Sequence, residues 1–266
     1  MKQISLALMG AIVLSTPSAA TAQPLSYFTW TTNGNAITIT GLTNSGYIGA
    51  VTVPATINGL PVTSIGDNAF SGCYCLTSIT IPDSIATIGD YAFNCYRDTV
   101  IQPGSSLTKI IIGSGVTNIG TNAFYGCTEL GGILFEGNPP TIPGSIDFSM
   151  VFDMGFETTF WPSAYYLPGT TGWGSTIAGS PALLWNPTLQ SLNVQSNQCS
   201  FDITGTTNIP IVVEATTDLT RGTWVPLQTC MLTNGLLHFT DSTFRNNPTR
   251  FYRIGYWSGH VVVTSP

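Results

Sequence analysis

The sequence predicts a mainly β fold: a short solenoid, then an aromatic-rich cap, then a small β-sandwich. Two observations predict this order. A phrase that starts with Ser64-Ile-Gly-Asp returns in near copies from Thr87 and from Asn118. Farther along, short alternating apolar runs are separated by turn residues about every eight to twelve positions, as in small sandwiches. We therefore expect four segments: a signal peptide at 1–22, a solenoid with its N-terminal cap at 23–140, a cap and linker at 141–187, and a sandwich at 188–266.

The first segment has the three parts of a secretory signal peptide. Lys2 precedes an apolar run from Ile4 to Leu14, and Ala20-Thr21-Ala22 offers a cleavage site. The run is shorter than the about 20 apolar residues that a membrane span needs, and no later run is long and apolar enough. We therefore expect an exported protein, secreted or held at the cell surface, that begins at Gln23 after processing and has no membrane span.

The charge of the chain narrows the range of partners. Only 8% of the residues are charged, and the formal net charge is −6. An acidic chain without a basic cluster is a poor match for nucleic acid or for an anionic membrane surface. The expected partner is an extracellular protein or glycan, and no motif in the chain indicates a cofactor.

The recurring phrase predicts the solenoid. A period in the twenties is typical of coils that are too small to bury their own apolar face and that become stable only when stacked. Each apolar side chain of the phrase should then lie against its copy in the next coil. We expect three internal columns: Ile65, Ile88 and Ile119; Phe70, Phe93 and Phe124; Leu76, Leu107 and Leu130.

The stretch "LTSITIPDSIATIGDYAF" from Leu76 resembles the repeat of the BspA-like leucine-rich repeat family. The resemblance covers about residues 51–139. It implies a leucine-rich-repeat solenoid in an exported bacterial protein, with a noncatalytic role in surface attachment. The middle repeat departs from the pattern, because it loses a residue before Cys95 and then gains an insertion from Tyr96. We therefore expect Cys95 to lie outside the column of repeat cysteines.

The last segment carries a second resemblance. The runs "VVEATTDL", "TWVPLQT" and "RFYRI" resemble those of small fibronectin-like or immunoglobulin-like β-domains at the ends of exported bacterial proteins. This resemblance implies a spacer or an attachment module.

Six cysteines in an exported chain raise the question of disulfides. Cys73, Cys95 and Cys127 end the recurring phrase, and we expect them to be buried as small apolar side chains. Pairing of Cys73 with Cys75, or of Cys199 with Cys230, stays open at this stage.

A row of side chains on the predicted sheet is the main candidate binding site. If the flanking isoleucines point inward, alternation turns Thr52, Thr80, Ile111 and Leu134 outward across successive strands. The apolar end of this row would form a partner site, or the cap would cover it. Asp in place of Ile111 and Leu134 should then weaken partner capture and leave the fold intact. Arg97 and Asp98, on the insertion, offer a second possible contact.

The sequence offers little catalytic chemistry. The two histidines are His238, expected on the solvent side of a strand, and His260, near the end of the chain. Asp153 and Glu157 are spaced by four, so a helix would bring these carboxylates together as a glycosidase would require. Solvated acids on a cap explain them as well. We expect a noncatalytic binding or adhesion protein; a self-associating envelope protein and a glycan-active enzyme are the alternatives.

Overall fold

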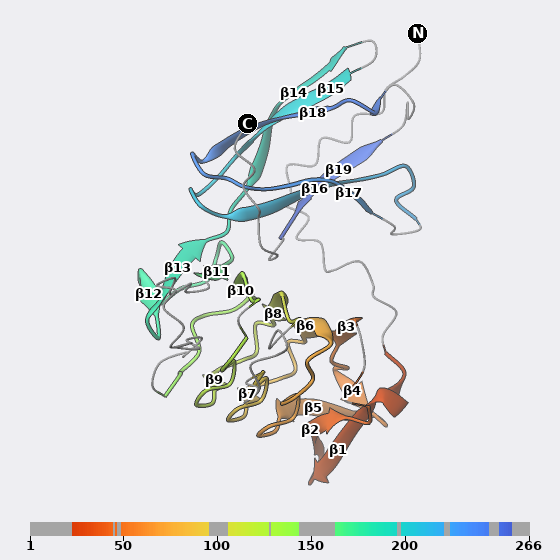
Figure 1. Cartoon of the computed structure of the whole chain (residues 1–266), viewed down its shortest axis with the longest axis vertical. Helices are drawn as coiled ribbons and strands as arrows, with labels where there is room; N and C mark the ends of the chain where they lie inside the picture. Colours follow the sequence, from red (N-terminus) through yellow and green to blue (C-terminus); the bar gives the residue numbers. More distant parts are fainter. Residues whose placement is uncertain are drawn as a thin grey trace, which may run out of the picture. The chain divides into compact units, whose positions relative to one another are not determined.

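The structure is a computed structural model of the whole chain. It describes residues 23–44, 46, 49–95, 106–127, 129–143, 163–195, 198–220, 224–244 and 250–256. These residues fall into two compact units, a repeat unit that ends at Asn186 and a second unit from Pro187 to Tyr256. The strands of both units are labelled in Figure 1. The mainly β fold that the sequence predicts is confirmed.

The repeat unit contains two sheets that run along the same stack of coils. The first has the strand order β1-β2-β5-β7-β9, with β4 paired to β5. Its strands are β1 (Phe28–Asn33), β2 (Ala36–Leu42), β4 (Thr56–Ile57), β5 (Leu60–Ile65), β7 (Thr87–Ile88) and β9 (Asn118–Ile119), preceded by the 3-10 helix η1 (Leu25–Tyr27). Because β1 and β2 form an antiparallel hairpin, they close the N-terminal end of this sheet.

The second sheet has the order β12-β13-β11-β10-β8-β6-β3. Its strands are β3 (Gly49–Thr52), β6 (Leu76–Ile81), β8 (Lys109–Ile112), β10 (Gly132–Phe135), β11 (Ser163–Tyr166), β12 (Thr176–Ile177) and β13 (Ser180–Leu184). All pairings from β3 to β13 are parallel. Each coil therefore contributes one strand to this sheet, and Figure 1 shows the successive coils side by side.

The phenylalanine column lies at the centre of the stack. The rings of Phe70 and Phe93 stack with centroids 5.1 Å apart at an interplanar angle of 1°, and those of Phe93 and Phe124 at 5.5 Å and 10°. All three are 1% exposed. The isoleucine and leucine positions of the repeat are also buried: Ile65, Ile88, Ile119, Leu76, Leu107 and Leu130. The coils therefore share one continuous apolar core.

The Gly-Asp pair of the phrase joins each turn to the next. The Asp67 carboxylate accepts a hydrogen bond from the Asp90 backbone N–H at 2.8 Å, and the Asp90 carboxylate accepts one from the Thr121 N–H at 2.7 Å. A Cβ on Gly89 would lie 2.4 Å from Asp67 Oδ1, and one on Gly120 would lie 2.4 Å from Asp90 Oδ1. Glycine follows isoleucine in the repeat because any side chain there would collide with the carboxylate below.

The cysteines of the phrase are buried thiols that form no disulfide. Cys95 and Cys127 lie with their Sγ atoms 3.4 Å apart, and both thiols donate to the Phe93 carbonyl at 3.2 Å. The expectation that Cys95 leaves the column is therefore wrong, because the missing residue shortens only the turn. Burial, followed by the neighbouring thiols, raises the pKa of Cys73 to about 11. Cys75, Cys199 and Cys230 are also free thiols.

The described part of the predicted cap continues the sheet. Strands β11 and β13 extend it with the same parallel register, pairing Leu134 with Tyr165 and then Leu183. The hairpin β12–β13, Thr-Ile-Ala-Gly-Ser-Pro, matches the hairpin β4–β5, Thr-Ile-Asn-Gly-Leu-Pro. In both, the two central residues have left-handed backbone: φ is 51° at Asn58 and 45° at Ala178, each followed by glycine.

The second unit is a sandwich of two three-stranded antiparallel sheets, with orders β14-β15-β18 and β17-β16-β19. Its strands are β14 (Thr188–Gln195), β15 (Gln198–Thr204), β16 (Pro210–Thr216), β17 (Val225–Met231), β18 (Leu236–Asp241) and β19 (Phe251–Gly255). Phe201 and Phe239 of the first sheet contact Tyr252 of the second, with centroids 5.3 and 6.3 Å away. These rings form the core between the two sheets.

Candidate functional site

The row expected on the second sheet is formed, but its apolar end is buried. The register aligns Thr52 with Thr80, Thr80 with Ile111, and Ile111 with Leu134. Both threonines are half-buried, whereas Ile111 and Leu134 are each 5% exposed. Neither belongs to the inner core to which Ile110 and Ile133 contribute, so both side chains point away from it and are covered. Of the two readings left open by the sequence, an exposed partner surface and a covered apolar row, this burial fits the second, and Asp at these positions would bury a charge.

Several residues singled out from the sequence lie outside the described residues: Arg97, Asp98, Asp153, Glu157 and His260. His238 is described, and its side chain is 66% exposed on β18, as expected. Its Nδ1 lies 2.7 Å from Asp202 Oδ1 on the neighbouring strand. This hydrogen bond is the main reason that the pKa of Asp202 is lowered. An exposed pair of this kind offers no enclosed site for a reaction.

A second surface, which the sequence analysis did not single out as a binding site, is formed by the exposed turns of the repeat. We call it the turn face and define it as Asp67, Asn68, Asp90, Tyr91, Thr121 and Asn122. The residue after the Asp or Thr has left-handed backbone in all three coils, with φ of 56° at Asn68, 53° at Tyr91 and 52° at Asn122. Asparagine tolerates this conformation better than most residues, which explains its recurrence.

The turn face is rigid because its supports lie directly beneath it. Ala69, Ala92 and Ala123 and the three stacked phenylalanines follow each turn and are buried. Backbone bonds join the coils here as well: the Phe70 N–H donates to the Ala92 carbonyl and the Phe93 N–H to the Ala123 carbonyl, both at 2.7 Å. Neighbouring turns are thus held at the spacing of the phenylalanine rings, about 5 Å.

The chemistry of the turn face is polar, with one exposed aromatic ring. Tyr91 is 38% exposed, and its hydroxyl accepts a hydrogen bond from the Asn122 side-chain amide at 3.1 Å. Asp67 and Asp90 are exposed, and each uses Oδ1 within the fold. The face therefore offers amide, hydroxyl and carboxylate groups beside a tyrosine ring, a combination suited to hydrogen bonding and stacking.

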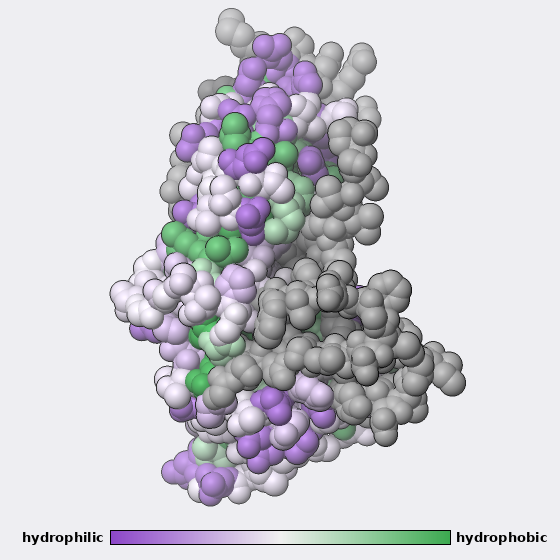
Figure 2. All heavy atoms as spheres, turned by 60° about the vertical axis from the view of Figure 1, so that its left-hand side comes forward, coloured by the Kyte–Doolittle hydropathy of each residue, from purple (hydrophilic) through white to green (hydrophobic). Residues whose placement is uncertain are grey.

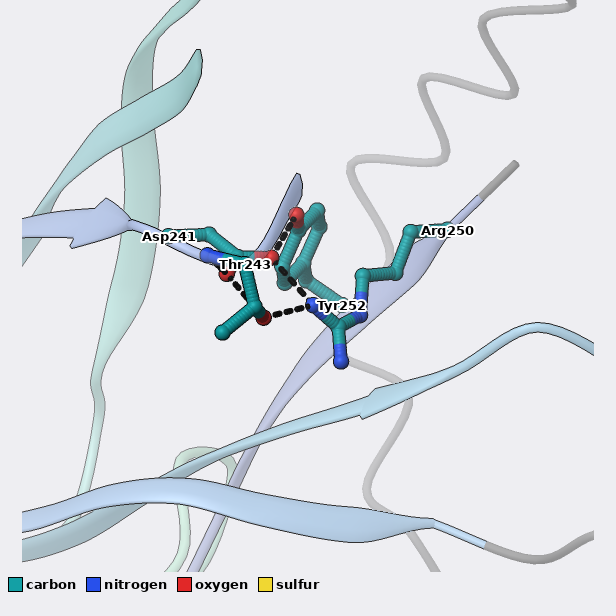
Figure 3. A network of polar contacts seen from close by, with 4 residues as sticks. All are labelled: Asp241, Thr243, Arg250 and Tyr252. Atoms are coloured by element: carbon teal, nitrogen blue, oxygen red, sulfur yellow. Dashed lines mark hydrogen bonds and ion pairs between the residues drawn. The ribbon is translucent and has the colours of Figure 1, made fainter. Parts of the chain in front are cut away.

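A buried polar cluster in the second unit joins Asp241, Thr243, Arg250 and Tyr252 (Figure 3). Asp241, 2% exposed, accepts hydrogen bonds from Arg250 at 2.6 Å and from the Tyr252 hydroxyl at 2.7 Å. The N–H and hydroxyl of Thr243 donate to its other oxygen. Burial by itself would raise the pKa of Asp241, but these hydrogen bonds lower it on balance.

This cluster stabilises the sandwich. Asp241 ends β18 in one sheet, and Arg250 and Tyr252 lie just before and within β19 of the other. Burial, followed by the hydrogen bond to Asp241, raises the pKa of Tyr252, so the phenol stays protonated as a donor. Both carboxylate oxygens are occupied by donors within the fold, so the carboxylate serves as a link between the two sheets.

An acidic pair in the repeat unit has a structural role too. Asp83 accepts hydrogen bonds from the Ser114 N–H at 2.7 Å and hydroxyl at 2.9 Å, which links two coils. Burial, and then the charge of Asp83, raises the pKa of Glu136. Within the described part of the chain, no cluster of three or more potential metal ligands occurs. None of the described helices is long and apolar enough to cross a membrane.

The stacked coils and their shared apolar core define a class of protein, the repeat solenoids. Within that class, residues 43–146 match the model of the BspA type leucine rich repeat region, in six copies. This segment of the chain therefore consists of BspA-type leucine-rich repeats. The match does not extend to the second unit, and the resemblance of that unit to fibronectin-like or immunoglobulin-like domains stays a prediction.

Two solved structures are similar to part of the chain. A leucine rich repeat protein from T. pallidum is 26% identical, with 47% of this chain and 64% of that chain covered and a TM-score of 0.38. A leucine rich cell surface protein from Faecalibacterium prausnitzii A2-165 is 26% identical, with coverage of 44% and 41% and a TM-score of 0.29. The chain thus spans less than two thirds of the length of either. A search of curated proteins gives no significant match.

Proposed function

We propose that this chain is an exported, noncatalytic binding protein that presents the turn face of its solenoid to an extracellular partner. The observation that carries the proposal is the column of polar residues Asn68, Tyr91 and Asn122, fixed in one backbone conformation at a regular spacing; Asn68 and Tyr91 are exposed and Asn122 is half-buried. A rigid surface binds with a small loss of conformational entropy, because its side chains and backbone are already ordered. This supports recognition as the function of the repeat.

Of the two partner classes expected from the sequence, the composition of the face favours a glycan. Sugar hydroxyls pair with amides and carboxylates, and a sugar ring stacks on an exposed aromatic ring such as Tyr91. On the molecular face in Figure 2, the apolar side chains of the described residues form small groups that are separate from one another. Among the described residues of that face, no large contiguous apolar area of the kind typical of an obligate protein partner is visible.

The test is an array of glycans and matrix proteins probed with the chain from Gln23. We expect glycan binding that falls at least about tenfold, or about 1.4 kcal/mol, in Tyr91→Asn. This variant copies the residue of the other two coils, so it keeps the left-handed turn and removes the ring together with the hydroxyl that accepts the Asn122 hydrogen bond. Tyr27→Asn is the matched control, because Tyr27 is similarly exposed, at 36%, but lies on η1, outside the turn face. Glycan binding that is equal in the wild type and Tyr91→Asn would exclude the turn face, and capture of a matrix protein without any glycan would replace the glycan by a protein partner.

A further inference from the structure

Strand β14 of the second unit has an unpaired edge that nothing else in the described structure covers. It is the outer strand of the order β14-β15-β18, and all eight of its residues, from Thr188 to Gln195, are exposed. Three of them are large and apolar: Leu189 is 46% exposed, Leu192 43% and Val194 37%. A free edge of this kind offers a row of backbone donors and acceptors that another extended strand can pair with.

The other edges of the sandwich carry features that discourage pairing, and β14 lacks them. Pro226 lies in the edge strand β17, where it removes an N–H from the ladder. The edge strands β18 and β19 are joined to each other by the bonds of Asp241 to Arg250 and Tyr252. The sequence of β14, TLQSLNVQ, contains no charge and no proline. An uncharged edge favours pairing with an identical strand, because no like charges are then placed opposite each other about the two-fold axis.

The pattern of faces along β14 is symmetric about its centre. Leu189 pairs with the buried Ile203, and Val194 pairs with the buried Cys199, so both side chains point to the inner face of the sheet. Gln190 pairs with Asp202 and Asn193 with Ser200, so these two amides point to the outer face. From either end of the strand, the first three side chains therefore alternate in the same way: a polar one on the outer face, an apolar one on the inner face and a polar one on the outer face.

A bulge makes this symmetry possible. The register shifts between Gln190 and Asn193, and Ser191 there has left-handed backbone, with φ of 54°. In a regular strand, positions 189 and 194 would face opposite sides. The extra residue restores them to one side, so an antiparallel copy centred between Ser191 and Leu192 matches face with face. Leu189 would then lie opposite Val194 of the second copy, and Gln190 opposite its Asn193.

We propose that the second unit pairs with a second copy of this chain through β14, antiparallel, about a two-fold axis between Ser191 and Leu192. The two sheets β14-β15-β18 then join into one continuous sheet. Leu189 and Val194 cover each other on its inner face, while the side-chain amides of Gln190 and Asn193 hydrogen-bond on its outer face. A bulge usually protects an edge from pairing; here it lies at the axis, where it interrupts the ladder only once. This surface is independent of the turn face.

The test uses the chain from Gln23 to Pro266 and measures its mass by sedimentation over a range of concentrations. We expect a dimer with a Kd below about 1 mM. The double variant Gln190→Lys/Asn193→Lys places like charges opposite each other, and its Kd should rise at least about tenfold. The variant Gln190→Lys/Asn193→Glu carries the same number of new charges but places Lys opposite Glu, and it should keep a Kd close to that of the wild type.

Both positions are exposed, so circular dichroism should show the same fold in all three proteins. A wild type that stays monomeric to about 1 mM would overturn the proposal. So would a dimer that the Lys/Lys variant leaves intact. A dimer that the Lys/Lys variant breaks and the Lys/Glu variant fails to restore would overturn the proposed register. Loss of glycan binding in Tyr91→Asn does not bear on any of these outcomes.

Discussion

The two units bury their cores in different ways. In the repeat unit, equivalent residues of successive coils pile up, as with Phe70, Phe93 and Phe124, so each coil depends mainly on its neighbours. In the second unit, two sheets face each other, and residues distant in sequence, such as Asp241 and Tyr252, meet across them. A repeat therefore supplies a regular surface, whereas the sandwich supplies individual contacts between distant residues and free strand edges.

The largest effect should come from the middle of the phenylalanine column. Phe93→Ala leaves a cavity between the rings of Phe70 and Phe124 and should lower the free energy of unfolding of the repeat unit by about 3 to 5 kcal/mol. Hydrogen exchange resolved by segment should show faster exchange in β6, β7 and β8. Protection in β15 and β16 should stay unchanged, because these strands lie in the other unit. Equal loss of protection in both units would contradict the separation.

Removing the charge of the buried Asp241 carboxylate should destabilise the second unit and leave the repeat unit unchanged. Asp241→Asn leaves Arg250 without its counter-charge and should destabilise the sandwich by about 3 kcal/mol. The same exchange measurement should now show the loss in β15, β16 and β18. Unchanged protection of those strands in this variant would show that the cluster does not hold the sheets together.

Acid should affect the second unit through the same carboxylate. Because the pKa of Asp241 is lowered in the folded state, its contribution is fully present above the ordinary aspartate value of about 3.8. The contribution is lost as the pH falls through the lower folded value. The stability of the wild-type second unit should therefore fall more steeply below about pH 4 than that of Asp241→Asn. Identical slopes would contradict this assignment.

The smallest effect on stability should come from exchanging the residues at the turns of the two matched hairpins, β4–β5 and β12–β13. Ala178 adopts a left-handed conformation that Asn58 adopts at lower cost, so Ala178→Asn should stabilise the unit by up to about 1 kcal/mol. The reverse change, Asn58→Ala, should destabilise it by a similar amount. Thermal unfolding of both variants checks the pair, and a shift in the same direction for both would contradict the backbone argument.

The repeat explains why so much of the first unit can be predicted from sequence. Three copies of Ile-Gly, Ala-Phe and Cys place the same residues in the core each time, and the coil is too short for another arrangement. The burial of Ile111 and Leu134 was one of two outcomes that the sequence left open, because alternation tells which way a side chain points and not what covers it. The left-handed turns were open to prediction from the Asn and Tyr that precede Ala-Phe, but nothing marked them as a surface.

The features that could not be predicted depend on contacts between residues far apart in sequence. The strands β11 and β13 interrupt the period, and the one signal for them was the recurrence of Thr-Ile-X-Gly-X-Pro at both ends of the unit. In the sandwich, the sequence does not distinguish Asp241 from other carboxylates at strand ends, because its partners Arg250 and Tyr252 come from another sheet. Similarly, the symmetry of β14 appears only once the bulge at Ser191 is known.

The central claim is that successive coils hold one another in register and so build the turn face. The most direct measurement is a pair of double-mutant cycles on unfolding free energy, with phenylalanine changed to leucine. Neighbours Phe70 and Phe93 should be coupled by about 1 kcal/mol, whereas Phe70 and Phe124, separated by a coil, should show coupling close to zero. Coupling that is absent for both pairs, or equal in both, would contradict the stacked-coil account.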